Sequence, residues 1–215
     1  MVWLILVAIG TIVGLITWAS SVYARKRREA FAKRADQLGL DVYFDLPEQD
    51  WDRLEEFELY KKHGRSQRVE VAVIAQTDTT RVVVCEYTSV VGSGKNKSTQ
   101  PAVVLLVTDK RLALPQMVIA RRTWTASIAK WVGYRYIEFP DDPDFNSQYL
   151  VRGESEEAVR SYLDQARRRK LAATVLESFE TLREHFIVVH RGIRMQPSQI
   201  EARIAEALAA LKVIL

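Results

Sequence analysis

The sequence carries no charged side chain before Arg25, and this feature constrains the chain more than any other. Residues 2–22 are apolar, small or weakly polar, and as a helix rising about 1.5 Å per residue they span about 31 Å, one hydrocarbon core. A basic run at residues 25–28 follows directly. Because basic residues stay on the cytoplasmic side, the pattern predicts a single-pass transmembrane helix at residues 1–24, with the N-terminus outside and the remaining chain cytoplasmic.

A cleavable signal peptide is the alternative interpretation of the same residues. Residues 22–24, Val-Tyr-Ala, place small or apolar side chains where a signal peptidase cuts. Against this alternative, no Lys or Arg precedes the apolar run, and the run exceeds the usual 7 to 15 residues. The basic residues behind it would also have to cross the membrane, which the charge rule disfavours.

The net charge of +4 is concentrated just after the apolar run. Six of the 31 basic and two of the 27 acidic residues lie within residues 25–36, so the remaining chain carries 25 of each sign. A domain without net charge argues against nucleic-acid binding. The basic residues suit anionic lipid headgroups, and the predicted headgroup ligands are Arg25, Lys26, Arg27, Arg28, Lys33 and Arg34.

The pattern of apolar residues predicts an α+β domain with a mainly antiparallel sheet and flanking helices. The basic helix occupies residues 25–39, because Gly39 is a suitable C-terminal stop, and the domain fills residues 40–215. Residues 57–121 alternate as short strands, with Val69, Val71, Val73 and Ala75 expected on one face. Residues 164–182 have helical spacing and predict a long helix. Two subdomains meeting near residue 122 and one continuous unit are equally consistent with the pattern.

One loop resembles a phosphate-binding motif without matching it. The P-loop pattern needs glycine where Ser89 stands and Ser or Thr where Asn96 stands, and a helix rather than a strand should follow. A weaker prediction is an anion-binding loop that combines backbone amides with two lysines. Its residues are Gly92, Gly94, Lys95 and Lys97.

The other polar groups have structural explanations. Asp141, Asp142 and Asp144 lack the spacing of a calcium loop and are typical of turns next to proline. The basic run at residues 167–170 is expected on a solvated helix face, with an acidic lipid or protein as the alternative partner. Cys85 is the only cysteine, so it forms no intrachain disulfide, and a buried strand position explains it. The sequence therefore indicates no catalytic residue, metal ligand or cofactor.

Two glycines in the apolar run have the spacing that lets helices approach closely. Gly10 and Gly14 are separated by three residues, as in the small-residue motif of transmembrane dimers. The spacing predicts self-association through this face.

Residues 57–60, 86–88, 92–96, 114–115 and 149–153 carry a resemblance to a family of uncharacterised bacterial membrane-anchored proteins. Members of that family resemble this chain in placing a short membrane segment or a basic N-terminus before a mixed α/β domain. The resemblance implies a bacterial inner-membrane protein. It implies no activity and no catalytic residue.

These observations predict a binding or scaffolding module with a protein partner at the membrane. The alternative is an envelope-associated, hydrolase-like enzyme whose site is assembled from residues distant in the sequence. A deep pocket in which Glu86, His63, Arg152 or Tyr149 converge would favour the enzyme. An exposed apolar surface would favour the binding module.

Overall fold

The computed structural model describes the chain except residues 1, 62–64, 92–96, 123–134 and 174–177. Its strands are β1 (Asp41–Tyr43), β2 (Arg65–Gln76), β3 (Thr80–Val91), β4 (Ser98–Asp109), β5 (Leu114–Arg121), β6 (Tyr149–Gly153), β7 (Ser178–Arg183) and β8 (His185–Arg191). Its helices are α1 (Val2–Gln37), α2 (Glu48–Glu56), α3 (Glu58–Lys61), α5 (Pro143–Gln148), α6 (Glu156–Tyr162), α7 (Gln165–Ala173), η4 (Pro197–Gln199) and α8 (Ile200–Ile214).

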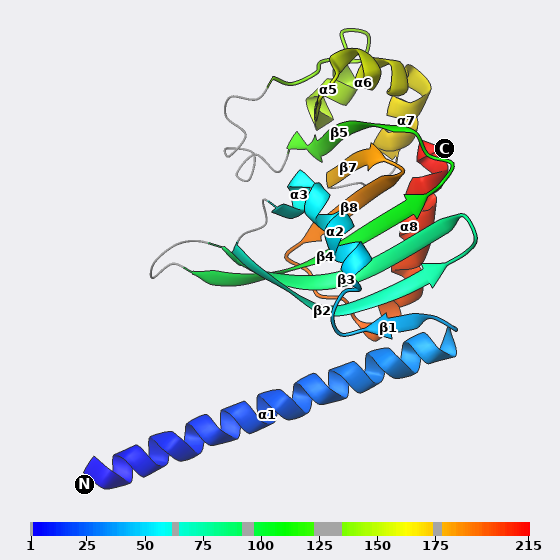
Figure 1. The fold of residues 1–215 in the computed structure, drawn as a ribbon. Helices are drawn as coiled ribbons and strands as arrows, with labels where there is room; N and C mark the ends of the chain where they lie inside the picture. Colours follow the sequence, from blue (N-terminus) through cyan, green and yellow to red (C-terminus); the bar gives the residue numbers. More distant parts are fainter. Residues whose placement is uncertain (1, 62–64, 92–96, 123–134, 174–177) are drawn as a thin grey trace.

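The strands form one eight-stranded antiparallel sheet in the order β1-β2-β3-β4-β8-β7-β5-β6. Helix α8, the C-terminal part of α1, and helices α5 to α7 supply apolar side chains to one face, and α2 and α3 cover the other (Figure 1). The predicted α+β class with an antiparallel sheet is confirmed. Strands from both sides of residue 122 belong to this single sheet, because β8 and β7 connect β4 to β5.

Helix α1 is continuous from Val2 to Gln37 and ends just before Gly39, whose φ is +65°. Only its last part packs on the domain, where Phe31 and Ala35 are fully buried, while its N-terminal part projects beyond the sheet (Figure 1). On that projecting part Leu15 and Trp18 are 59% and 66% exposed.

The prediction of a transmembrane helix is wrong. Among the residues that the structure describes, no helix has both the length and the apolar character that crossing a membrane requires. Residues 2–24 continue without a break into the charged residues of α1, as expected for a helix that ends at Gly39. The finding also contradicts the predicted single-pass placement in a bacterial inner membrane, with the N-terminus outside and the domain cytoplasmic.

A bulge in β2 corrects the predicted sheet face. Val69 pairs with Tyr87 and Val71 pairs with Glu86, so an extra residue, Glu70, interrupts the alternation. A bulge moves the following side chains to the opposite face. Val69 therefore packs on the α2 and α3 side, while Val71 packs on the α8 side.

Two segments adopt a different secondary structure from the predicted one. Residues 57–60 were expected as a strand, but Glu58–Lys61 is the short helix α3. The predicted helix over residues 164–182 is helical only as α7, and Ser178–Arg183 is strand β7, buried between β8 and β5. Pairing with strands on both sides decides the conformation of β7, which the local spacing of apolar residues does not reveal.

Candidate functional site

Three adjoining cavities follow strand β5 and its neighbours. Their volumes are about 810, 560 and 430 Å³. The first and second share Leu114 and Arg183, and the second and third share Gln116 and Glu154. We call these three adjoining cavities together the β5 groove.

A bulge and a glycine shape the middle of the β5 groove. Pro115 has no N–H to donate to a neighbouring strand, and the register between β5 and β7 shifts between Leu114 and Met117. The Pro115 carbonyl instead accepts a hydrogen bond from Thr181 Oγ1 at 2.6 Å. At Gly153, an added Cβ would lie 2.5 Å from Val159 Cγ2 and 2.7 Å from the Gln116 oxygen. Only glycine therefore lets α6 approach the sheet this closely.

The narrow end of the groove contains a polar cluster, the Glu180 cluster, formed by Arg152, Glu58 and Glu180. Val118 of β5 pairs with Arg152 on one side and with Glu180 on the other, so these two side chains share a sheet face. Glu180 is 2% exposed and accepts hydrogen bonds from the backbone N–H of Glu58 at 2.9 Å and of Leu59 at 2.7 Å. Arg152 is 7% exposed and forms an ion pair with Glu58.

Burial dominates the electrostatics of Glu180. Removal from water disfavours the charged carboxylate and raises the pKa of Glu180 to about 7, although the two backbone N–H groups act in the opposite direction. The cluster therefore contains a carboxyl group that changes charge near neutral pH.

The wide end of the groove is apolar with cationic sides. Leu112, Leu114 and Pro115 contribute its apolar lining, and Arg167 and Arg183 its positive charges. The Arg167 guanidinium lies 4.5 Å from the ring centroid of Tyr162. Arg183, the last residue of β7, adopts a φ of 55° and forms an ion pair with Glu56.

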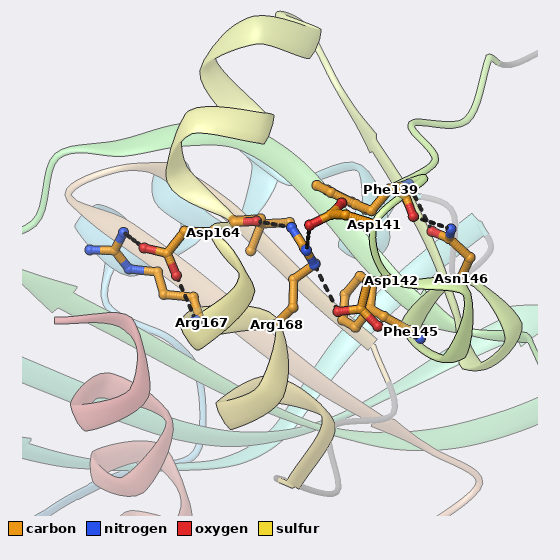
Figure 2. Close-up of polar contacts among 9 residues, drawn as sticks. Phe139, Asp141, Asp142, Phe145, Asn146, Asp164, Arg167 and Arg168 are labelled. Atoms are coloured by element: carbon orange, nitrogen blue, oxygen red, sulfur yellow. Dashed lines mark hydrogen bonds and ion pairs between the residues drawn. The ribbon is translucent and has the colours of Figure 1, made fainter.

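A second arginine centre, the Arg168 cluster, lies outside the groove (Figure 2). Arg168 donates from Nε to Asp142 at 3.0 Å, from Nη2 to Asp141 at 2.5 Å, and from Nη1 to the Leu163 carbonyl at 2.8 Å. Asp142 also caps α5 by accepting from the Phe145 N–H at 3.2 Å. These acids therefore connect the turn before α5 to α7.

The same geometry corrects the view of residues 167–170 as one solvated face. The Arg168 side chain is only 4% exposed, and its guanidinium lies 4.5 Å from the ring centroid of Phe139.

Among the described residues, no group of three or more His, Cys, Asp or Glu could hold a metal ion.

Arg27, predicted as a lipid ligand, reaches into the domain instead of projecting to solvent. Its Nη2 donates to Glu86 Oε2 at 2.7 Å and to the Met195 carbonyl at 3.0 Å. The Glu86 side chain is fully buried, and the same Oε2 accepts from the Met195 N–H at 2.6 Å. This contact fastens α1 to β3.

The other predicted headgroup ligands are divided between internal contacts and solvent. Arg34 forms an ion pair with Glu201 of α8, and Arg25 pairs with Glu29 at 3.0 Å on an exposed face. The Arg28 guanidinium lies 5.3 Å from the ring centroid of Phe44. The remaining two, Lys26 and Lys33, are exposed. Their binding to anionic headgroups stays a prediction.

The other predicted sites are only partly described. Of the predicted anion-binding loop, Gly92, Gly94 and Lys95 lie outside the described residues, and Lys97 is exposed. Both glycines of the small-residue motif lie on α1, and a Cβ added at Gly14 would meet no atom within 4 Å. Self-association through Gly10 and Gly14 stays a prediction.

Of the residues proposed for an enzyme site, the three that the structure describes do not converge, and His63 lies outside the described residues. Arg152 lies on the α3 side of the sheet, whereas Glu86 contacts α1 and Tyr149 stacks on Phe145 of α5. Glu86 and Tyr149 are on β3 and β6, five strand positions apart in the sheet, which corresponds to roughly 24 Å.

Sequence reasoning did not find Glu58 and Glu180 as site residues. Glu180 lies in the segment expected to be a helix, where an acidic residue is unremarkable. The usable signal was Arg152, a charged residue in the apolar strand Tyr149–Gly153, because a buried charge needs a partner.

No protein-family model matches this chain, and no curated protein matches it. Its fold is similar to the crystal structure of the mycobacterial trehalose monomycolate transport factor A, TtfA, with a TM-score of 0.55. The two chains are 12% identical, and the match covers 89% of this chain and 94% of that chain. At this identity the likeness shows a shared fold and nothing finer. The resemblance to an uncharacterised bacterial family stays a prediction.

Proposed function

We propose that this protein is a binding module that docks an extended segment of a partner protein in the β5 groove. The observation that carries the proposal is the series of three adjoining cavities along β5. An elongated depression accommodates an extended chain, whereas small-molecule sites are mostly single concave pockets.

The charges of the groove support a peptide that carries both signs. At the wide end, Arg167 and Arg183 outnumber Glu184, which suits acidic side chains of the ligand. In the middle, Glu56 and Glu154 lie beside Lys61 and Arg183, so this part can pair with either sign. The apolar lining at Leu112 and Leu114 would take an apolar anchor between them. Complementary charge of this kind fixes the register of a docked segment.

The chemistry of the groove favours binding over catalysis. In the described part of the groove, burial raises the pKa of Glu180 and of Tyr162. Backbone N–H groups already occupy both oxygens of Glu180, and the Tyr162 hydroxyl donates to the Ile214 carbonyl. A general base needs an oxygen directed at the substrate. The similar fold belongs to a protein named as a transport factor, which agrees with a binding role and adds no substrate.

A groove-blocking variant tests the proposal. Ala113 is exposed and lines the wide end, so Ala113→Trp fills the groove without disturbing the core. The matched control is Ala205→Trp on the exposed side of α8. We expect affinity capture followed by mass spectrometry to recover a partner with the wild-type chain and the control, and to lose it with Ala113→Trp.

Two results would overturn the proposal. If both variants recover the partner equally, the partner binds outside the groove. If the wild-type chain recovers no specific protein, the proposed protein partner does not exist. A lipid captured in place of a protein, and lost in Ala113→Trp, would identify the groove as a lipid site and also contradict a peptide ligand. Thermal unfolding of both variants controls for folding.

A further inference from the structure

A small polar cavity lies at the turn between β2 and β3, and it shares no lining residue with the β5 groove. Its volume is about 180 Å³. One water occupies about 30 Å³, and drug-sized ligands need at least about 300 Å³, so the cavity has room for a small ion with a few waters. We call it the turn cavity.

Three cationic side chains from separate elements line the turn cavity. Arg53 comes from α2, Arg81 from the start of β3, and Lys110 from the turn after β4. Their convergence is a product of the fold, since the three positions are widely separated in the sequence. The other residues that line the cavity are polar: Gln49, Gln76, Thr77, Asp78, Thr79, Thr80 and Thr108.

The acidic residues around the cavity do not neutralise these cations. Asp50 is fully buried and pairs with Arg81 through two hydrogen bonds, of 3.0 and 2.7 Å. Arg53 shares the same carboxylate, with its Nη1 3.5 Å from Asp50 Oδ1. Asp78 is the only acidic residue in the lining. Within the lining itself, three positive side chains face one negative one, and Arg81 is already paired with Asp50 from outside the lining.

Two of the cations have hydrogen-bonding capacity left. Arg53 Nη1 is buried, and beyond its 3.5 Å ion-pair contact with Asp50 it forms no hydrogen bond in the described part of the chain. Lys110 is exposed, and its side chain forms no ion pair with any described residue. An unmet buried donor costs free energy that an anion can recover, and charge-assisted hydrogen bonds are the strong ones.

We propose that the turn cavity binds a phosphate group, as inorganic phosphate or as a phosphomonoester. A tetrahedral oxyanion presents acceptor oxygens in several directions and a charge close to −2. It therefore matches donors that arrive from α2, from the β2–β3 hairpin and from the turn after β4. The site goes beyond the proposed peptide binding and would act independently of it.

Calorimetric titration of the full chain with inorganic phosphate, at fixed ionic strength, tests the site. We expect saturable binding that weakens at least tenfold in Lys110→Gln. Lys212→Gln removes the same charge from the exposed side of α8 and should leave the affinity unchanged. Amide resonances of residues 77–81 should shift during the titration in the wild-type chain and not in Lys110→Gln.

Arg53→Gln provides a second variant, and thermal unfolding checks its fold because Arg53 also contacts Asp50. Titration with phenyl phosphate separates the two sources: equal or tighter binding identifies a phosphomonoester site, and loss of binding identifies free phosphate. Absence of saturable binding, or equal weakening in Lys110→Gln and Lys212→Gln, would overturn the proposal.

Discussion

The Arg168 cluster and the Glu180 cluster each pair a buried arginine with a partly exposed acid, but only the second also contains a buried carboxyl group. In the first, Arg168 is buried while the side chains of Asp141 and Asp142 are 61% and 18% exposed. In the second, Arg152 and Glu180 are both buried, and they border a cavity of about 430 Å³.

The difference separates a structural contact from a site. The acids of the Arg168 cluster keep access to water, so their charged forms carry little desolvation cost. The buried Arg168 guanidinium donates hydrogen bonds to three acceptors. Burial of the Glu180 carboxyl makes its charge costly, and an open space remains beside it. A buried carboxylate next to a cavity is the arrangement that responds to pH or to a ligand.

The largest expected effect comes from removing the buried arginine of the Arg168 cluster. Arg168→Met should lower the free energy of unfolding by about 3 kcal/mol, because the Leu163 carbonyl loses its donor and Asp142 loses a charged hydrogen-bond partner. Urea denaturation at pH 7 measures it. The neighbouring Arg169 is exposed, and Arg169→Met should change stability by less than about 0.5 kcal/mol. Equal losses of stability in both variants would show that the buried contacts of Arg168 do not stabilise the fold.

A pH dependence should distinguish the Glu180 cluster. The folded-state pKa of Glu180, about 7, lies above its ordinary value of 4.5, so the folded protein prefers the protonated carboxyl. The stability from this group is full below pH 4.5 and is lost as the pH rises through 7, by about 3 kcal/mol.

Glu180→Gln should remove that pH-dependent fall, whatever its effect on absolute stability. The measurement is the difference between wild-type and variant free energies of unfolding from pH 4.5 to 8, which cancels other titrating groups. A difference that does not vary with pH would mean that Glu180 ionises normally and that the two clusters are electrostatically alike.

A methyl group added at Gly153 tests how tightly α6 packs on the sheet beside the groove. Gly153→Ala should destabilise the fold by about 2 kcal/mol, because its Cβ would overlap Val159 and the Gln116 carbonyl. Gly14→Ala is the control, since its Cβ meets open space. Thermal unfolding of both variants checks this, and a neutral Gly153→Ala would show that α6 can move away from the sheet.

The smallest effect is expected for the most exposed acid. Asp141→Asn should cost less than about 1 kcal/mol, because the Asp141 carboxylate is 61% exposed and Arg168 keeps Asp142. Urea denaturation of Asp141→Asn and Arg168→Met under the same conditions compares their losses in free energy of unfolding. A loss as large as that of the arginine variant would make the pair with Asp141 the main contact of the cluster.

Sequence periodicity predicted the elements whose conformation is decided locally. Val71 and Val73 alternate toward one core, and Gly39 follows the end of α1 as its helix stop. Sequence periodicity predicted the wrong secondary structure where pairing with distant strands decides the conformation. Phe179 and Leu182 have helical spacing, yet Phe179 pairs with Val188 in β8 and with Ile119 in β5. The Glu180 cluster was missed for the same reason.

The membrane prediction failed on the same distinction between local pattern and assembled structure. The apolar run was interpreted as a membrane span from its length and composition, whereas no helix among the described residues qualifies as a span. Arg27 was assigned to anionic lipid headgroups by its place in a basic run, but its Nη2 lies 2.7 Å from Glu86 Oε2 in the fold.

The sequence alone determined the α+β class, the antiparallel strands and the charge balance of the domain, because these depend on alternation and composition. Tertiary structure decided the site. Glu58, Arg152 and Glu180 come from α3, β6 and β7, and Arg53, Arg81 and Lys110 meet in the turn cavity only after α2 packs on the sheet. The energy of a charge depends on burial and on neighbours distant in the chain, and a linear pattern contains neither.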